Sequence, residues 1–299
     1  MPMFSRVTLS RITPLLAVSG LLACASTEKA PAADSTALPA AASASPAVAE
    51  PPVITIVASD FKYEAPDTIS AGMVTLKLVN KGPELHHVQL LRFTGGKTYA
   101  DFQAGMKDMK PGAPPPPWVE SVGGPNTPVP GGEMQITEDL PAGNYAMICF
   151  IPSADHMPHF TKGMVKGLTV IPATTASVAA PTADIRVSMT DYAWEVTPAI
   201  TPGKHIIRLE NLASQDHEMF IVRLEKGKTP LQVAQWGENP VGPPPGIPLG
   251  GTSGMPKGAV IYVPIDLTAG EYAFLCFIPD IKDGKPHYVH GMLKAFTVT

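Results

Sequence analysis

Two stretches of the chain each contain a cysteine, a histidine and a methionine in the same order. The first, residues 149–164, reads CFIPSADHMPHFTKGM, and the second, residues 276–292, reads CFIPDIKDGKPHYVHGM. Nine residues separate Cys149 from His159, ten separate Cys276 from His287, and four separate each histidine from its methionine. A thiolate, an imidazole and a thioether are soft ligands of the kind that copper selects. The two stretches therefore predict two copper sites.

A further ligand of each set is expected from a histidine upstream of the cysteine. His217 is the candidate in the second half, whereas the first half offers the adjacent pair His86 and His87. Aligning the two halves pairs His86 with His217 and His87 with Glu218. Alternation along a strand agrees, because it places His86 on the inward, apolar face. The predicted metal ligands are His86, Cys149, His159 and Met164 in the first half, and His217, Cys276, His287 and Met292 in the second.

Two more histidines lie within the loops. His156 competes with His159, but only His159 stands in the frame P-H-[F/Y]-x-x-G-M that both halves contain, and His290 is likewise extra. Taken singly, a methionine before a strand or a buried cysteine is usually a core residue. The same ordered set, found twice, favours metal ligation.

These ligands must be positioned by a repeated scaffold, since nearly everything after residue 52 occurs twice. Residues 60–61 correspond to 191–192, residues 143–149 to 270–276, and residues 164–170 to 292–298. The break between the copies, residues 173–183, is rich in Ala, Pro and Thr. We expect one domain over residues 53–172 and a second over residues 184–299.

Each copy has the pattern of short strands. Val74, Leu76 and Leu78 alternate with other residues, as do Ile185, Val187 and Met189, and Gly and Pro punctuate the segments. This predicts an all-β fold of two tandem Greek-key β-sandwiches. One short helix is expected per copy, at residues 229–232 with a threonine N-cap and more weakly at 98–101. Proline-rich loops, 111–132 and 240–258, are expected at the surface.

The N-terminal residues have the features of an export signal. Two arginines precede an apolar stretch that is too short and too interrupted to span a membrane. The stretch ends in LLAC, which resembles a bacterial lipoprotein lipobox, with lipid attached to Cys24; an ordinary secretory signal is the alternative. We expect a signal peptide at residues 1–23, a disordered Ala/Pro/Ser tether at 24–52, and a lipid-anchored protein on the periplasmic or extracytoplasmic face of a bacterial cell envelope.

In such a compartment cysteines usually form disulfides. Cys149 and Cys276, however, occupy equivalent places in two copies, so pairing them would need both copies to direct the same loop at one spot. Two thiols kept free by metal ligation is the simpler interpretation.

The ordered motif resembles the cupredoxins, such as plastocyanin and azurin, and its long loop looks most like the type 1 copper loop of copper nitrite reductases. The resemblance implies cupredoxin-like sandwiches and up to two type 1 copper ions, each bound by two imidazoles, a thiolate and an axial thioether. It also implies electron transfer with a redox partner protein. A Cu(I) carrier or storage protein with a copper donor or acceptor, and a metal-free binding module, remain alternatives.

Two classes of function are not expected. The formal net charge of −4 provides no basic surface for nucleic acid. Multicopper oxidases and nitrite reductases place a histidine next to the thiolate ligand, whereas Ile148 and Phe150 flank one cysteine here, and Leu275 and Phe277 the other. We therefore expect no enzyme activity, at most two tightly held copper ions, and a membrane association through the lipid alone.

Overall fold

The computed structural model describes residues 49–108, 115–176 and 178–299. The expected signal peptide, Cys24 and nearly all of the tether lie outside these residues. Within them, no helix is long and apolar enough to cross a membrane.

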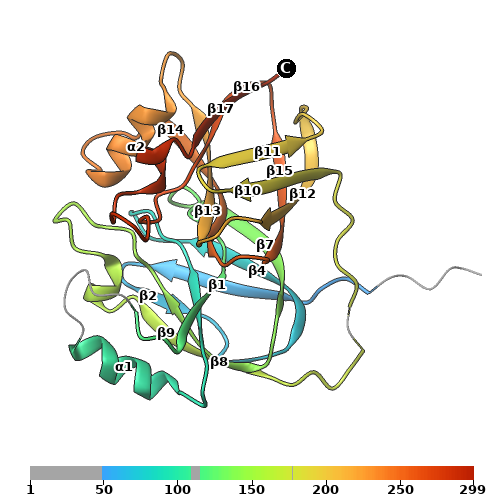
Figure 1. The fold of residues 1–299 in the computed structure, drawn as a ribbon, viewed down its shortest axis with the longest axis vertical. Coiled ribbons are helices and arrows are strands. Elements are labelled where there is room, and N and C mark those ends of the chain that lie inside the picture. The colour runs from blue at the N-terminus through green and yellow to red at the C-terminus, as the bar shows by residue number, and fades with distance from the viewer. Residues whose placement is uncertain (1–48, 109–114, 177) are drawn as a thin grey trace, which may run out of the picture. The chain divides into compact units, whose positions relative to one another are not determined.

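The described part of the chain is built mainly from β-strands (Figure 1). The first copy contains β1 (Val53–Ser59), β2 (Lys62–Glu64), β3 (Thr68–Ser70), β4 (Gly72–Asn80), β5 (Gln89–Phe93), α1 (Tyr99–Asp108), β6 (Val119–Gly123), β7 (Glu133–Leu140), β8 (Gly143–Ile148), the 3-10 turn η1 (His159–Lys162) and β9 (Val165–Ile171). The second contains β10 (Ile185–Thr190), β11 (Ala193–Thr197), β12 (Gly203–Asn211), β13 (His217–Leu224), α2 (Pro230–Glu238), β14 (Gly246–Met255), β15 (Val260–Leu267), β16 (Gly270–Leu275), η2 (His287–His290) and β17 (Leu293–Val298).

Three sheets organise these strands. An eight-stranded sheet has the order β11-β10-β12-β15-β7-β4-β1-β2, so each copy contributes four strands to it. Each copy also has a sheet of its own, β3-β9-β8-β5-β6 in the first and β14-β13-β16-β17 in the second. The alternating residues predicted to be inward, such as Leu76 and Val187, are buried in a hydrophobic core that draws on all three sheets. The expectation of an all-β fold is therefore confirmed.

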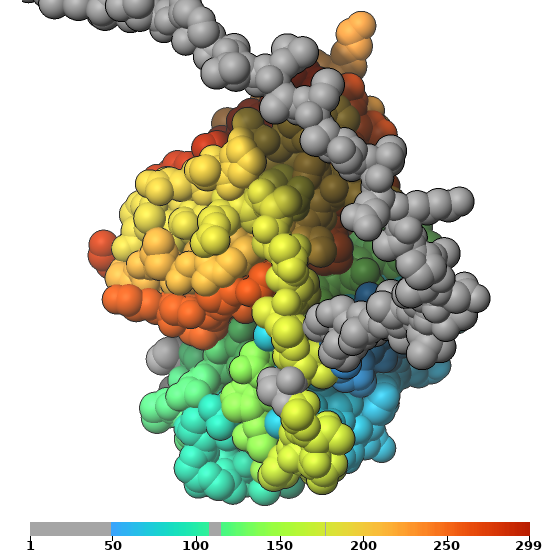
Figure 2. Space-filling model, turned by 90° about the vertical axis from the view of Figure 1, so that its right-hand side faces the viewer, coloured from blue at the N-terminus to red at the C-terminus, as the bar shows by residue number. Residues whose placement is uncertain are grey.

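The two copies meet where β7 pairs with β15, between the blue-to-green and the yellow-to-red strands of Figure 1. This pairing makes one sheet out of strands that two separate sandwiches would keep apart. The domain boundary at residues 173–183 remains a prediction. Its described residues, 173–176 and 178–183, are largely exposed and run over the surface of the molecule (Figure 2).

A second contact between the copies is made by residues 123–128 and 248–255, which we call the seam segments. Asn126 N–H donates to Gly251 O at 3.0 Å, and Ser253 N–H donates to Gly124 O at 2.8 Å. The alignment pairs Gly124 with Gly251 and Asn126 with Ser253, so equivalent residues exchange hydrogen bonds. Glycine is required, because a Cβ on Gly124 would lie 2.1 Å from the carbonyl oxygen of Val88.

The seam segments correct one expectation. Both belong to the proline-rich loops that were expected at the surface, yet residues 123–128 are buried and residues 246–255 form strand β14. Some of their backbone groups pair with the other copy, while β14 also pairs with β13 of its own copy. The helix predictions are confirmed: Thr229 and Gln232 form a capping box at the start of α2, and the hydroxyl of Thr98 accepts from the backbone of Asp101 at the start of α1.

Candidate metal centres

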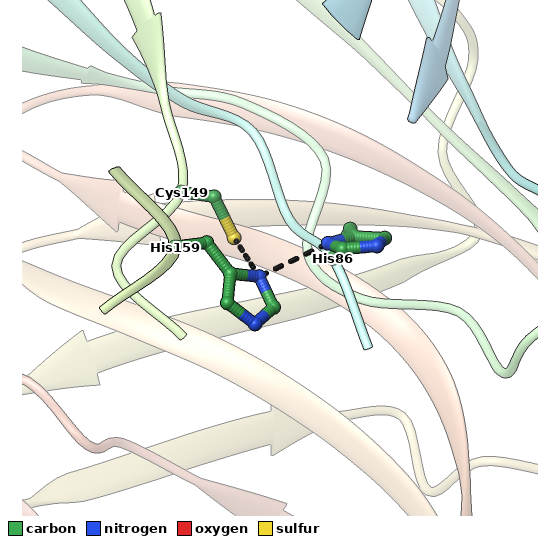
Figure 3. Close-up of side chains that lie close together, drawn as sticks. All are labelled: His86, Cys149 and His159. Atoms are coloured by element: carbon green, nitrogen blue, oxygen red, sulfur yellow. Dashed lines mark hydrogen bonds between the residues drawn. The ribbon is translucent and has the colours of Figure 1, made fainter. Parts of the chain in front are cut away.

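The first predicted ligand set comes together at one end of the β5/β8/β9 sheet. His86 Nδ1 lies 3.0 Å from His159 Nδ1, and Cys149 Sγ lies 3.4 Å from the same nitrogen. Figure 3 shows the sulfur of Cys149 and the ring of His86 both facing that atom. All three side chains are fully buried. Two imidazole nitrogens and one sulfur therefore converge in a site closed to water.

Local structure fixes the loop that carries three of the proposed ligands. Cys149 directly follows β8, His159 opens η1, and Met164 directly precedes β9. Met164 N–H donates to His159 O at 3.1 Å, and Cys149 N–H donates to Met164 O at 3.3 Å. Gly163 ends the turn with φ of 106°, a conformation that favours glycine. This explains why G-M follows the histidine in both copies, and it places the buried Met164 beside Cys149.

The outer nitrogens of the histidines are held by carboxylates. His86 Nε2 lies 2.7 Å from Asp60 Oδ1, and His159 Nε2 lies 3.0 Å from Glu84 Oε2. Metal-binding histidines commonly make such contacts, which set the tautomer and leave the other nitrogen free to ligate. The arrangement of inner Nδ1 atoms and outer carboxylates therefore fits a bound metal ion.

The second set has the same plan. Cys276 Sγ lies 3.3 Å from His287 Nδ1 and 3.8 Å from His217 Nδ1, and all three residues are fully buried. His217 Nε2 is 3.2 Å from Asp191 Oδ1. His287 Nε2 has no hydrogen-bond partner among the described residues, and it lies 3.7 Å from Asp280 Oδ2.

Burial sets the protonation states at both centres. It lowers the pKa of the proposed histidine ligands, to about 4 for His287, so the imidazoles are neutral, as ligation requires. Burial also raises the pKa of Cys149 to about 12 and that of Cys276 well above its ordinary value. Neither of these cysteines forms a disulfide. A metal ion would therefore have to displace a proton from each thiol.

His87, the competitor of His86, has a different position. It is buried, and the N–H of Phe150 donates to its Nε2 at 2.9 Å. In the second copy Glu218 takes the equivalent place, and the N–H of Phe277 donates to its carboxylate at 2.7 Å. Both side chains thus accept a hydrogen bond from the backbone N–H of the residue that follows the cysteine. The strand β5 begins only at Gln89, so His86 and His87 precede it, in contrast to the expectation that they lie on the strand.

The remaining histidines lie outside both sets. His156 and His290 are exposed, and His205 pairs with Asp184 at 2.6 Å. The supporting residues Asp60, Glu84, His87, Glu218 and Asp280 were not predicted as part of the sites. The pairing of Asp60 with Asp191 in the repeat alignment was the one signal for them.

No protein-family model and no curated protein matches the sequence. Among solved structures, the chain is similar to reduced auracyanin from Roseiflexus castenholzii, at 22% identity over 40% of this chain and 97% of that one, with a TM-score of 0.29. It is similar to an azurin from Methylomonas sp. strain J, at 18% identity over 40% and 98%, with a TM-score of 0.26. It is also similar to a Cu-containing nitrite reductase from Thermus scotoductus, at 10% identity over 83% and 61%, with a TM-score of 0.21.

These TM-scores are low, and the case for metal binding rests on the ligand geometry. Each centre combines two buried imidazole nitrogens and a buried thiol. A buried methionine, Met164 or Met292, follows at the end of the same loop, directly before the next strand. The two His-Cys-His sets with their methionines fit type 1 copper sites, which confirms the resemblance to the cupredoxins that the sequence motifs indicate.

Proposed function

We propose that this chain is an exported, lipid-anchored electron-transfer protein with a type 1 copper site in each copy. The observation that carries the proposal is the pair of buried His-Cys-His sets, in which inner Nδ1 and Sγ atoms converge. The residues that would hold copper are His86, Cys149, His159 and Met164 in the first copy, and His217, Cys276, His287 and Met292 in the second. Bound copper would supply one-electron redox chemistry at each centre.

The protein's own part is to hold the ligands still. The strands at both ends of each loop, the Nε2–carboxylate contacts and the buried surroundings restrict movement of the imidazoles and the thiol. A site that barely rearranges between oxidation states favours fast electron transfer. Electrons would be exchanged with a redox partner protein.

The alternatives make different demands on the same residues. A Cu(I) carrier must release its metal to an acceptor, and full burial of every proposed His and Cys ligand favours retention over release. A metal-free module has no use for two converging sets of neutral imidazoles and thiols. The electron-transfer proposal therefore has the stronger support.

We also propose that the chain is not an enzyme, although the solved structures similar to it include a nitrite reductase. The residues on either side of each cysteine are apolar and have no side-chain ligand for a second, catalytic metal. A catalytic metal needs protein ligands and open coordination positions.

The test is a copper titration of the full chain, followed by visible absorption and electron paramagnetic resonance. We expect an intense thiolate-to-copper band that saturates at two copper ions and bleaches reversibly on reduction. A colourless protein that binds and readily exchanges Cu(I) would support the carrier, and a protein that takes up no copper would support the metal-free module. Nitrite or oxygen turnover would show that the protein is an enzyme.

A further inference from the structure

A third group of side chains of metal-ligating types lies beside the second proposed ligand set. Asp280, Asp283 and His290 each bring one ligand atom to within 4.8 Å of the others. All three belong to the loop between β16 and β17, and none is among the proposed type 1 ligands. We call these three residues the rim cluster.

The rim cluster is fixed at its inner end and open at its outer end. Asp280 is buried; its carboxylate accepts from the hydroxyl of Tyr192, from Gln215 Nε2 at 2.9 Å and from the N–H of Lys282 at 2.7 Å. These hydrogen bonds hold the pKa of Asp280 well below its ordinary value. The side chains of Asp283 and His290, 3.1 Å apart, are 37% and 28% exposed. Solvent therefore reaches two of the three potential metal ligands, Asp283 and His290, while the carboxylate of Asp280 is buried and held by hydrogen bonds.

A buried imidazole nitrogen faces the cluster without a partner. His287 Nε2 lies 3.7 Å from Asp280 Oδ2 and makes no hydrogen bond to any described residue. In the first copy the equivalent nitrogen of His159 is held by Glu84. Gln215 replaces Glu84 in the alignment, and it binds Asp280 instead. A buried polar group without a partner is costly, and the carboxylate that faces this nitrogen is Asp280 of the rim cluster. The unpartnered nitrogen therefore marks the inner side of the rim cluster as a place where a polar group is missing.

The first copy fills the same place with a cation of its own. Lys162 aligns with His290; its Nζ lies 2.8 Å from Asp155 and 4.8 Å from the ring centre of Phe61. In the second copy the corresponding aromatic ring, Tyr192, lies 5.1 Å from the His290 ring. Asp280 moreover stands where the first copy has Ser153. The second copy has thus exchanged an ammonium group for a metal-binding imidazole and gained a carboxylate.

One lysine approaches the cluster in the second copy. Lys285 Nζ lies 3.8 Å from Asp283 Oδ2, and both side chains are exposed. An exposed pair at this distance is weak, so it does not neutralise the cluster as Lys162 neutralises Asp155.

We propose that the rim cluster is an exchangeable site for a divalent transition metal ion, which binds Cu²⁺ and, less tightly, Zn²⁺. One imidazole and two carboxylates are ligands that both ions accept, and Cu²⁺ precedes Zn²⁺ in the Irving–Williams order. Three protein ligands leave positions for water, so the ion exchanges readily. The site lies next to His287 and therefore holds metal at the edge of the second buried centre.

The test measures zinc binding by calorimetry in the full chain and in the variant His290→Lys, which copies the first copy. The copper-loaded protein is first washed with a chelator that leaves its visible band unchanged. We expect one zinc ion per chain to bind the unaltered protein and none to bind His290→Lys. Asp283→Asn replaces a ligand carboxylate, and we expect it to weaken zinc binding at least about tenfold. Loss of a residue that only supports a ligand already weakens metal binding by about 10–100-fold.

Two controls separate this site from others. His156→Lys introduces the same charge beside the first centre and should leave zinc binding unchanged. Added Cu²⁺ should give a type 2 resonance signal in the unaltered protein that is absent in His290→Lys. If the buried centres fail to load with copper, the zinc bound by the metal-free chain must still fall by one ion in His290→Lys. Equal zinc binding in that variant and the unaltered chain, in either form, would overturn the proposal.

Discussion

At the residue scale, the two nitrogens of each imidazole have separate tasks in the first centre. The Nδ1 atoms of His86 and His159 face each other and Cys149, while their Nε2 atoms meet Asp60 and Glu84. A ring held in this way presents one nitrogen inward at all times. Adjacent histidines can therefore have unlike roles, since His87 turns to the backbone of Phe150.

The variants His86→Gln and His87→Gln test this division. We expect His86→Gln to abolish the thiolate-to-copper band of the first site, because it removes an inner nitrogen. We expect His87→Gln to retain the band, since a glutamine oxygen can still accept from Phe150. The visible spectrum of copper-loaded protein is the measurement.

His217→Gln is the matched control, because it should remove the band of the second site only. Loss of the first band in His87→Gln and its survival in His86→Gln would show that the ligand assignment is wrong by one residue.

The residue types at both centres could be predicted from the sequence, because order and spacing along one loop carry over directly into proximity. The supporting carboxylates could not. Asp60 and Glu84 come from two different turns, and only the packing of the sheets brings them to the histidines. Glu84 also has no acidic counterpart, since the second copy has Gln215 in its place.

At the scale of elements, the 3-10 turns η1 and η2 set the distance from histidine to methionine. Each ends in a glycine with φ above 100°, Gly163 and Gly291. The two hydrogen bonds between Met164 and the residues His159 and Cys149 depend on that reversal.

Gly163→Ala should therefore lower the free energy of unfolding by about 1–3 kcal/mol, the usual cost of forcing a side chain into such a conformation. It should also shift the absorption band of the first copper site, because Met164 moves. Chemical denaturation and the visible spectrum measure the two effects.

Gly105→Ala, within α1, is the control for the loss of a glycine as such. It should stabilise the protein by up to about 1 kcal/mol, because alanine is the better helix former. A Gly163→Ala variant as stable as the unaltered protein, with an unchanged band, would contradict the role given to the turn.

Strand β7 carries an ionisable group into the contact between the copies. Glu138 is buried, pairs with Val74 of β4 and with Ile261 of β15, and its Oε1 has no hydrogen-bond partner among the described residues. Burial raises its pKa to about 8. The protonated form is thus the one that the folded state accommodates.

The sign of the resulting pH dependence follows from linkage. An unfolded glutamate titrates at about 4.3, so between that value and about 8 the folded state binds a proton that the unfolded state has lost. Because of Glu138, the free energy of unfolding therefore falls as pH rises through this window, by at most about 1.4 kcal/mol per pH unit. Glu138→Gln should raise the melting temperature more at about pH 9 than at about pH 5.

Glu133→Gln, at the exposed start of the same strand, is the control and should show no such difference between the two pH values. A gain in melting temperature that is the same at both pH values would contradict the buried, protonated Glu138.

The sequence predicts the strands of each copy well, because apolar alternation reports which residues face a core. It does not predict that β7 and β15 pair. Glu138 interrupts the apolar alternation of Met134 and Ile136, and a strand with a buried acid has no sequence pattern that indicates its partner strand. The seam segments were misplaced for a related reason: prolines and glycines are typical of surface loops, and here they permit close backbone contact.

At the scale of the whole molecule, the shared sheet makes the two copies one compact unit, and the proposed lipid anchor lies well before it in the chain. Cys24→Ser should release the protein from the membrane fraction without changing its copper content, because Cys24 is not among the proposed copper ligands. Fractionation followed by metal analysis measures both. A variant that stays in the membrane fraction would rule out the lipid as the anchor.

The reciprocal hydrogen bonds of the seam segments resemble those of a symmetric dimer. Equivalent residues that exchange hydrogen bonds in this way have the arrangement of an isologous homodimer interface, here between two copies joined in one polypeptide. In a homodimer every substitution at the axis appears twice. Fusion removes that constraint: Asn126 Nδ2 binds Glu218 at 3.2 Å, whereas its counterpart Ser253 has a buried hydroxyl with no hydrogen-bond partner in the described chain. Asn126 of the first copy thus contacts Glu218, which holds the residue after Cys276, whereas Ser253 makes no matching contact with the first copy. Two copies in one polypeptide can differ in this way, and two identical subunits cannot.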